Sequence, residues 1–77
     1  MRLTLIQRDD CELCDQAWAL LASAGVADFE SCWIDGVADL EARYGARVPV
    51  LRRESDGDEL DWPFDADAVR RFIAALL

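Results

Sequence analysis

Two cysteines separated by two residues carry the clearest chemical signal in the chain, in the run Cys11-Glu12-Leu13-Cys14. If a helix begins at Cys11, the Cys14 sulfur lies one turn further on and can reach the Cys11 sulfur to close and open a disulfide. Unpaired backbone N–H groups and the positive end of the helix dipole favour a thiolate at Cys11. We therefore expect Cys11 to attack a disulfide as the nucleophile and Cys14 to resolve the resulting mixed disulfide.

Two other interpretations of the cysteine pair stay open at this point. Structural zinc sites use four ligands drawn from Cys and His, and the chain has three cysteines and no histidine. A metal site would therefore need Cys32 and an aspartate beside the pair. The pair could also be two incidental buried cysteines. We expect Cys32 itself to be a small core residue, because free cysteine is among the most buried residue types.

The composition excludes several classes of function. The chain has 77 residues, 53% of them hydrophobic, which predicts a single domain with one real core. Sixteen acids against eight bases give a formal net charge of -8. This charge repels phosphate backbones and anionic membrane surfaces, so we expect neither nucleic acid nor a membrane as a partner. The lack of His and Lys removes imidazole general-base catalysis and Schiff-base chemistry.

We expect a reducing, cytoplasmic location. The first apolar stretch is too short, and too soon followed by polar residues, for a signal peptide. No apolar run approaches the roughly 18 residues that span a membrane. The odd number of cysteines also differs from the even number typical of small secreted disulfide scaffolds. We expect the protein to act as a monomer.

The elements that must position the cysteine pair follow from hydrophobic periodicity. Short apolar runs bounded by polar residues predict strands, and apolar residues three and four apart predict helices. Seven elements are expected, in the order strand, helix, strand, helix, strand, strand, helix: Leu3–Gln7, Cys11–Ala24, Phe29–Ile34, Val37–Tyr44, Val48–Arg52, Glu59–Trp62, and a last helix from Asp65 or Asp67 that includes Val69, Phe72, Ile73, Leu76 and Leu77. This order predicts an α/β fold with a mixed four-stranded sheet and helices on both faces. The first two strands should be parallel and the last two antiparallel.

Three local signals mark the ends of these elements. Asp9 or Asp10 is expected to cap the first helix at its N-terminus. Gly25 is expected to end the same helix. The dipeptide Asp56-Gly57 predicts a hairpin turn between the last two strands.

In these features the chain resembles the glutaredoxin-like proteins of the thioredoxin superfamily, in particular the small bacterial glutaredoxin-like domains. Four features carry the resemblance: the strand that runs into Cys11-Glu12-Leu13-Cys14, the order of the elements, Arg47-Val48-Pro49-Val50, and Trp62-Pro63-Phe64-Asp65 before the last helix. The resemblance implies a thioredoxin-like fold and a thiol–disulfide oxidoreductase that reduces protein disulfides or glutathione mixed disulfides. It implies no resident cofactor, with glutathione as one candidate co-substrate.

The resemblance also implies where a substrate binds. It implies a cis peptide bond between Val48 and Pro49, in a loop beside the redox pair, and a backbone at Val48 that pairs with an extended substrate or glutathione strand. The alternative for Pro49 is a plain edge-strand proline. Further residues are expected around the substrate: Arg8, Glu12, Leu13, Arg47 and Asp65.

Some positions differ from glutaredoxins and leave two other functions open. Glu12 and Leu13 stand where glutaredoxins carry a proline and an aromatic residue, and Trp62-Pro63-Phe64 stands where they often carry a Gly-Gly pair. The second hypothesis is a non-catalytic protein-interaction module, with Trp62 and Phe64 as exposed aromatic residues. The third is a small metal or iron–sulfur carrier that uses Cys11.

The charges around the pair oppose the helix dipole. Four acids lie within four residues of the cysteines: Asp9, Asp10, Glu12 and Asp15. Because negative neighbours disfavour a thiolate, we expect Cys11 to be less activated than in strong oxidants. Glutathione, itself an anion, should be repelled at long range. The cations that could offset these acids locally are Arg8, Arg47 and Arg52.

Overall fold

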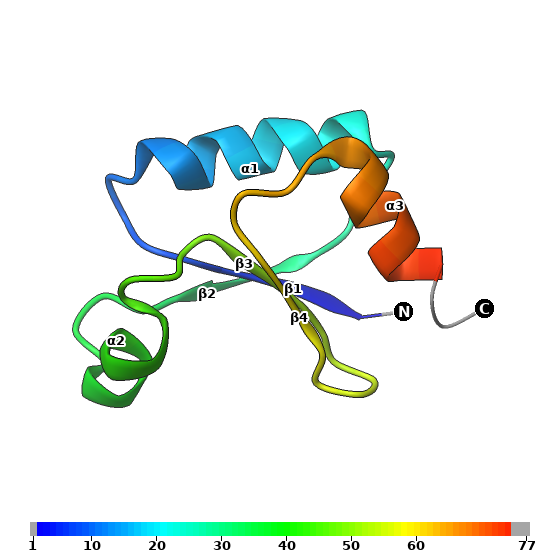
Figure 1. The fold of residues 1–77 in the computed structure, drawn as a ribbon. Coiled ribbons are helices and arrows are strands. Elements are labelled where there is room, and N and C mark those ends of the chain that lie inside the picture. The colour runs from blue at the N-terminus through cyan, green and yellow to red at the C-terminus, as the bar shows by residue number, and fades with distance from the viewer. Residues whose placement is uncertain (1, 75–77) are drawn as a thin grey trace.

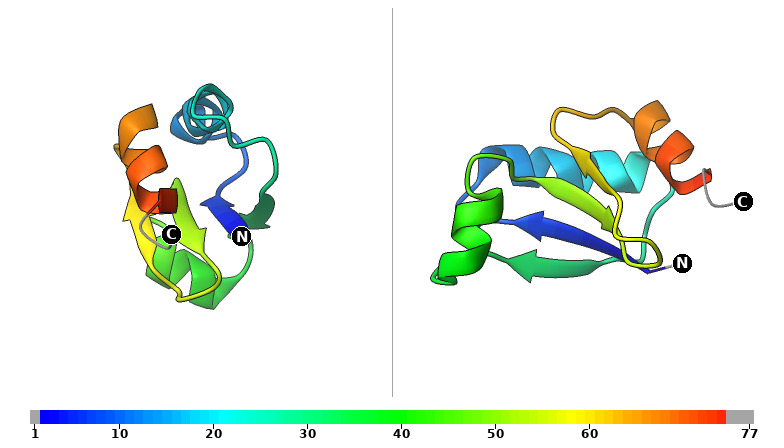
Figure 2. Two further views of the ribbon diagram at one scale, coloured as in Figure 1. Left: turned by 90° about the vertical axis from the view of Figure 1, so that its right-hand side faces the viewer. Right: turned by 60° about the horizontal axis from the view of Figure 1, so that its bottom comes forward.

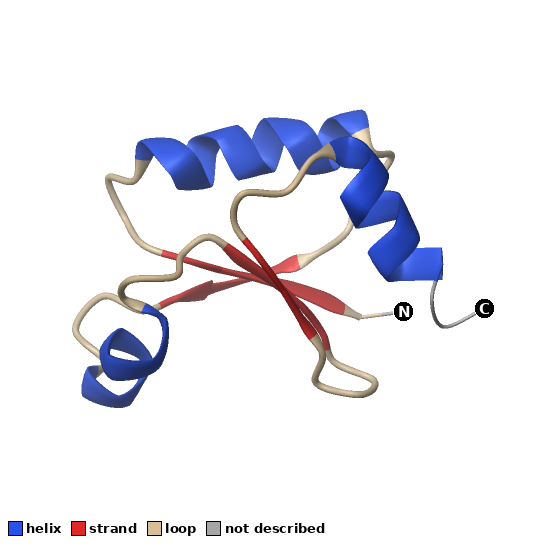
Figure 3. Cartoon of the chain, viewed as in Figure 1, coloured by secondary structure: helices blue, strands red, loops and turns tan. Residues whose placement is uncertain are grey.

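Four strands and three helices follow one another along the chain in the predicted order (Figure 1; Figure 3). The computed structural model describes residues 2–74. The elements are β1 (Leu3–Gln7), α1 (Glu12–Ser23), β2 (Glu30–Trp33), α2 (Ala38–Tyr44), β3 (Val50–Arg53), β4 (Glu59–Asp61) and α3 (Ala66–Ala74). Two positions predicted for the last helix, Leu76 and Leu77, lie outside the described residues.

The four strands form one mixed sheet in the order β2-β1-β3-β4. β1 and β2 are parallel and joined by α1, whereas β3 is antiparallel to β1 and β4 is antiparallel to β3. The predicted parallel pair and the predicted hairpin are both confirmed. Because β1 and β2 run in the same direction and β3 runs against them, the ends of β1 and β2 and the start of β3 meet at one end of the sheet (Figure 1).

Helices cover both faces of the sheet, with α1 and α3 on one face and α2 on the other (Figure 2). Successive residues of a strand point to opposite faces, so β1 and β3 contribute to two cores. The core under α1 and α3 contains Leu3, Leu5, Ala17, Leu21, Leu51, Phe64 and Val69. The core against α2 contains Ile6, Ile34, Tyr44 and Val50. None of the helices described in residues 2–74 is both long and apolar enough to cross a membrane.

Two glycines end elements where the sequence predicts. Gly25 has a φ of +85° after α1, and the Val26 N–H donates to the Leu21 carbonyl at 2.9 Å. Gly57 has a φ of +77° in the turn between β3 and β4, and its N–H donates to the Arg53 carbonyl at 2.8 Å. Glycine adopts these left-handed conformations without a steric penalty.

The start of the second helix differs from the prediction. Val37 was expected as the first apolar contact of this helix, but it is the N-cap residue of α2 and is 44% exposed. Leu40 and Tyr44, which follow Val37 at helical spacing, belong to the core against α2. The helix is therefore anchored by Leu40 and Tyr44 and not by Val37.

One arginine of β3 is buried beneath α3. Arg53 is 4% exposed, donates a hydrogen bond to the Phe72 carbonyl and lies over the Phe72 ring, with 4.4 Å from the guanidinium carbon to the ring centroid. It forms ion pairs of 2.8 Å with both Asp56 and Asp58. These carboxylates belong to the hairpin turn, so one side chain ties the turn to the end of α3.

Leu21→Ala should lower the free energy of unfolding by about 2–5 kcal/mol, because removing this fully buried side chain leaves a cavity between α1 and the sheet. Urea unfolding followed by circular dichroism measures the loss. Leu13→Ala on the same helix is the matched control, since Leu13 is 44% exposed and its removal should cost less than about 1 kcal/mol. Equal losses for the two variants would contradict this assignment of the core.

Candidate active site

The first helix begins at the cysteine pair. Cys11 is the N-cap residue of α1, and its Sγ accepts a hydrogen bond from the Cys14 backbone N–H at 3.1 Å. The two sulfurs lie at disulfide distance, with 5.2 Å between the Cα atoms. Cys14 is 1% exposed, whereas Cys11 is partly exposed. One residue of the pair is therefore partly open to solvent and the other is buried.

The prediction that Asp9 or Asp10 caps α1 is wrong. Asp10 has a φ of +52°, a left-handed conformation that aspartate tolerates in turns but that differs from the extended backbone of an N-cap. The Asp9 backbone N–H donates to Asp35 Oδ2 at 2.9 Å. The two aspartates therefore form the turn between β1 and α1, and Cys11 is the N-cap residue of α1.

A buried glutamine fixes the end of β1, from which the loop to the cysteines departs. Gln7 is 1% exposed. Its side-chain oxygen accepts a hydrogen bond from Trp18 Nε1 at 2.8 Å, and its Nε2 donates to Ser31 Oγ at 2.8 Å. Both polar atoms have partners, which offsets the cost of burying them. The amide thus joins β1 to α1 and to β2.

The peptide bond between Val48 and Pro49 is cis, as the resemblance implies. Pro49 is fully buried, and the pairing of Ile6 with Val50 places it beside the end of β1. The loop before β3 thus lies at the same end of the sheet as the start of α1 (Figure 1). The Val48 N–H donates to the Tyr44 carbonyl at 3.0 Å. The Val48 N–H is therefore already used within the fold.

A cluster of polar side chains around Tyr44 holds the loop before β3. Tyr44 is 1% exposed; its hydroxyl donates to Glu59 Oε2 and accepts from Arg52 Nη1 at 3.3 Å. Arg47 Nη2 lies 2.7 Å from Glu59 Oε1 and 2.7 Å from Asp61 Oδ1. These contacts connect α2, the loop, β3 and β4.

The same cluster shifts the ionisation of its members. Burial raises the pKa of Tyr44, and its hydrogen bond to Glu59 raises it further. Burial also acts to raise the pKa of the Glu59 carboxyl, but hydrogen bonds from Tyr44 and Arg47 outweigh it and hold the pKa below its usual range. Sequence analysis missed this cluster, because its members come from different elements and no local spacing links them.

The three arginines expected to offset the acids near the pair are engaged elsewhere. Arg8 pairs with Glu41 at 2.8 Å, and Arg52 pairs with Glu54 at 3.1 Å. Arg47 is held by two carboxylates of β4. Within residues 2–74, the four acids next to the cysteines form no ion pair: Asp9, Asp10, Glu12 and Asp15. The rim of the site is therefore negative.

The remaining predicted substrate residues lie in two places. Glu12 and Leu13 are exposed in the first turn of α1, directly after Cys11. Asp65 lies at the start of α3, where its Oδ1 accepts the Ala68 N–H at 2.7 Å. The sequence offered Asp65 or Asp67 for the start of the last helix, and Asp65 is the residue that caps it.

The expectation that Trp62 and Phe64 are exposed is wrong. Phe64 is 6% exposed within the core under α1 and α3, and the half-buried Trp62 packs against the same core. Their rings meet edge to face with 5.0 Å between centroids. The bond between Trp62 and Pro63 is also cis, which the sequence did not indicate. This burial removes one observation behind the interaction-module hypothesis, the exposed aromatic pair.

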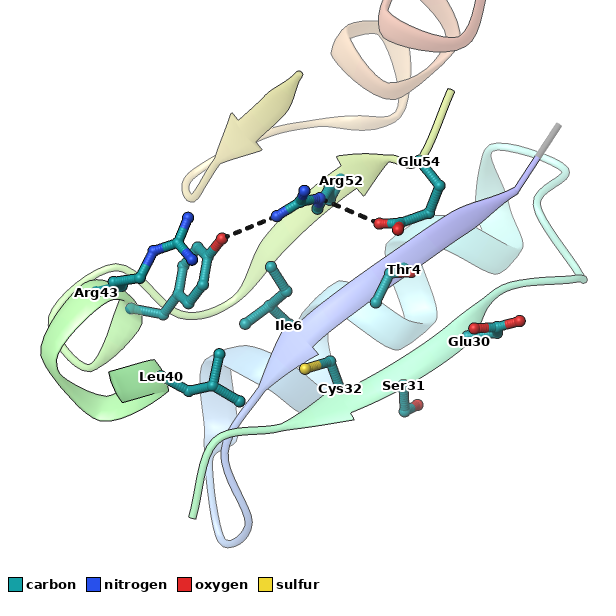
Figure 4. Close-up of a pocket in the computed structure, with 10 residues that line it drawn as sticks. Thr4, Ile6, Glu30, Ser31, Cys32, Leu40, Arg43, Arg52 and Glu54 are labelled. Atoms are coloured by element: carbon teal, nitrogen blue, oxygen red, sulfur yellow. Dashed lines mark hydrogen bonds and ion pairs between the residues drawn. The ribbon is translucent and has the colours of Figure 1, made fainter. Parts of the chain in front are cut away.

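A hollow of about 320 Å³ lies on the α2 face of the sheet, and neither cysteine of the pair lines it (Figure 4). Cys32 and Leu40 line this hollow and pack against the core next to α2. Cys32 is half-buried, so its expected place in the core is confirmed in part. In the described part of the chain, no three Cys, His, Asp or Glu side chains converge as metal ligands.

The mixed sheet, the cysteine pair at the start of α1 and the cis-proline loop beside it define a glutaredoxin-like protein of the thioredoxin superfamily. A family model described as glutaredoxin-like domain (DUF836) matches residues 2–74, and the chain belongs to this family. No curated protein matches the chain.

Solved structures agree with this assignment. The X-ray structure of the target protein XcR50 from X. campestris has a TM-score of 0.89 and 57% identity, over 95% of this chain and 96% of that one. The solution structure of XcR50 has the same TM-score of 0.89 and 57% identity, over 97% and 95% of the two chains. Protein Ne2328 from Nitrosomonas europaea is 29% identical with a TM-score of 0.76, over 92% and 88%. These similarities establish the fold and the family.

Glu59→Gln should lower the free energy of unfolding at neutral pH. As the pH falls, the free energy of unfolding of the variant should decrease less than that of the wild type. The pKa of Glu59 is lowered in the folded chain from an ordinary value of 4.5. Its stabilising contribution is therefore present above that value and is lost as the pH falls through the folded pKa. The variant lacks this titration. Urea unfolding at about pH 7, 5 and 3 measures the difference.

The matched control is Glu30→Gln. Glu30 pairs with Arg2 at 3.2 Å, but the two side chains are 64% and 71% exposed. Such surface pairs contribute little, so this variant should follow the wild type across the pH range. If Glu59→Gln and the wild type lose stability in parallel as the pH falls, the cluster around Tyr44 does not stabilise the ionised carboxylate.

Proposed function

We propose that the chain is a thiol–disulfide oxidoreductase that reduces protein disulfides or mixed disulfides with glutathione. One observation carries the proposal: the Cys11 sulfur caps α1 through the Cys14 N–H and lies at disulfide distance from the buried Cys14 sulfur. A helix N-terminus stabilises a thiolate. The difference in exposure supports the division of roles, because a substrate can reach Cys11 but not Cys14.

In the proposed reaction the Cys11 thiolate attacks one sulfur of the substrate disulfide. The substrate S–S bond breaks, its second sulfur leaves as a thiolate and takes a proton from water, and Cys11 is left in a mixed disulfide. Cys14 then gives up its thiol proton and attacks the Cys11 sulfur, and the first substrate sulfur leaves and is protonated. Two electrons have passed to the substrate. A thiol reductant, either glutathione or a thioredoxin-type protein, returns two electrons to the Cys11–Cys14 disulfide.

The other predicted site residues have narrower roles in this proposal. The Val48 carbonyl accepts a backbone N–H of an extended substrate beside Pro49. Leu13 offers an exposed apolar contact next to Cys11, and Glu12 adds to the negative rim. Three residues expected at the substrate support the fold through internal contacts: Arg8, Arg47 and Asp65.

The proposal includes a reducing, cytoplasmic setting, no resident cofactor and a monomeric protein. Cytoplasmic thiol systems keep cysteines reduced, which the attacking form of Cys11 requires. The two candidate electron donors, glutathione and a thioredoxin-type protein, differ in size and charge. The negative rim favours the donor whose contact surface is not anionic.

Cys11→Ser should reduce disulfide turnover to the background rate, because serine cannot form the mixed disulfide. The measurement is reduction of a model protein disulfide with glutathione or with a thioredoxin-type donor. Cys32→Ser is the matched control and should keep the wild-type rate, since Cys32 lies on the α2 face away from the pair. A wild type that reduces no disulfide with either donor would overturn the proposal.

Cys14→Ser should leave the attack of Cys11 on the substrate disulfide intact. It should stop the second step, in which Cys14 resolves the mixed disulfide. The mixed disulfide between Cys11 and the substrate should then accumulate, and mass spectrometry detects it as the substrate mass added to the chain. If the adduct forms on Cys32 instead, Cys11 is not the nucleophile.

Stoichiometric metal in protein purified without oxygen would favour the hypothesis of a metal or iron–sulfur carrier.

A further inference from the structure

A second hollow, of about 330 Å³, lies beside the start of α1 and is lined by Asp9, Trp33 and Asp35. Trp33 is one of the most exposed large apolar residues of the described chain, at 49%. This half-exposed ring belongs to neither core, and it lines the hollow together with two carboxylates. Its surroundings indicate binding.

The hollow is built by the ends of two parallel strands. Trp33 lies opposite Gln7 in the register of β1 and β2, and the Ile34 N–H donates to the Gln7 carbonyl at 3.0 Å. Beyond the strands, the Asp9 backbone N–H donates to Asp35 Oδ2 at 2.9 Å, which ties the two loops together. The residues lining the hollow are therefore held by main-chain contacts.

The two carboxylates remain available to a ligand. Among the side-chain contacts of residues 2–74, Asp35 uses one oxygen for the Asp9 N–H, and the Asp9 carboxylate has no hydrogen bond or ion pair. The nearest arginine in sequence, Arg8, is paired with Glu41. No cation of the described chain therefore neutralises this hollow.

We propose that the hollow binds the guanidinium or ammonium group of an arginine or lysine side chain in the substrate polypeptide. A cation is attracted to the face of an indole ring, and the two carboxylates accept its N–H groups in charge-assisted hydrogen bonds. This inference rests on the proposed function, because it names the class of substrate that the cysteine pair acts on: a disulfide in a polypeptide with a basic residue close to the reacting cysteine.

The distance to the reacting sulfur sets where the basic residue must lie. Asp9 precedes Cys11 by two residues, so their Cα atoms are at most about 7 Å apart. An extended substrate advances roughly 3.3 Å per residue. A basic side chain two or three residues from the substrate cysteine can therefore reach the hollow while that cysteine contacts Cys11.

The test uses three peptide homodimers, each joined by one disulfide and identical except for Arg, Gln or Glu two residues from the cysteine. Fully reduced protein is mixed with each at low ionic strength, and single-turnover rates are measured. The Arg peptide should react about 3–10-fold faster than the Gln peptide, and the Glu peptide slowest. Added salt should narrow the differences.

Two variants locate the preference in the hollow. Trp33→Leu keeps an apolar side chain without the indole face, and Asp35→Asn keeps an acceptor for the Asp9 N–H while it removes the charge. Each should lower the ratio of the Arg-peptide rate to the Gln-peptide rate, measured on the same variant, to within about twofold. Asp28→Asn is the matched control, because it removes an exposed carboxylate that does not line this hollow.

The outcomes separate the two proposals. If the wild type reduces none of the three peptides, the proposed function fails. If it reduces all three at the same rate, or if the preference for Arg survives in both hollow variants, the function stands and this inference fails. An equal loss of preference in Asp28→Asn would trace the effect to net charge and would also overturn the inference.

Discussion

The start of α1 depends on one hydrogen bond, from the Cys14 N–H to the Cys11 sulfur. This bond makes the accessible sulfur the cap of α1, so the start of the helix and the chemistry are built from the same atom. A thiolate accepts more strongly than an uncharged sulfur, so loss of the thiol proton from Cys11 in the reduced pair would strengthen the cap. The left-handed turn at Asp10 is what passes the cap position to the cysteine.

Most arginines of the described residues form ion pairs within the fold. Its bases are all arginines, eight against sixteen acids. Two of them, Arg47 and Arg52, surround Tyr44 and Glu59 and hold the loop that contains Pro49 against α2 and β4. The rim around the cysteines then has no balancing positive charge. The arginines that hold the cis-proline loop are therefore not paired with the acids around the cysteines.

Sequence patterns were sufficient for the order of the elements and for the pairs β1–β2 and β3–β4, because strand and helix periods are local. The central pairing of β1 with β3 joins distant segments and was not predicted. The cis bond before Pro49 came from the family resemblance alone, since X–Pro bonds are mostly trans. The helix cap was missed because aspartate is intrinsically the better cap, and the contact of Asp9 with Asp35 joins residues distant in sequence. The burial of Phe64 likewise depends on contacts between segments distant in sequence, which spacing does not encode.

Arg53 joins the hairpin turn to the end of α3. If α3 lifts from the sheet, the guanidinium loses the Phe72 carbonyl; if the turn unravels, it loses two carboxylates. Either local opening leaves a buried charge incompletely paired. The amides of α3 and of the hairpin should therefore exchange hydrogen with a shared opening free energy, so that this part of the molecule opens as one cooperative unit.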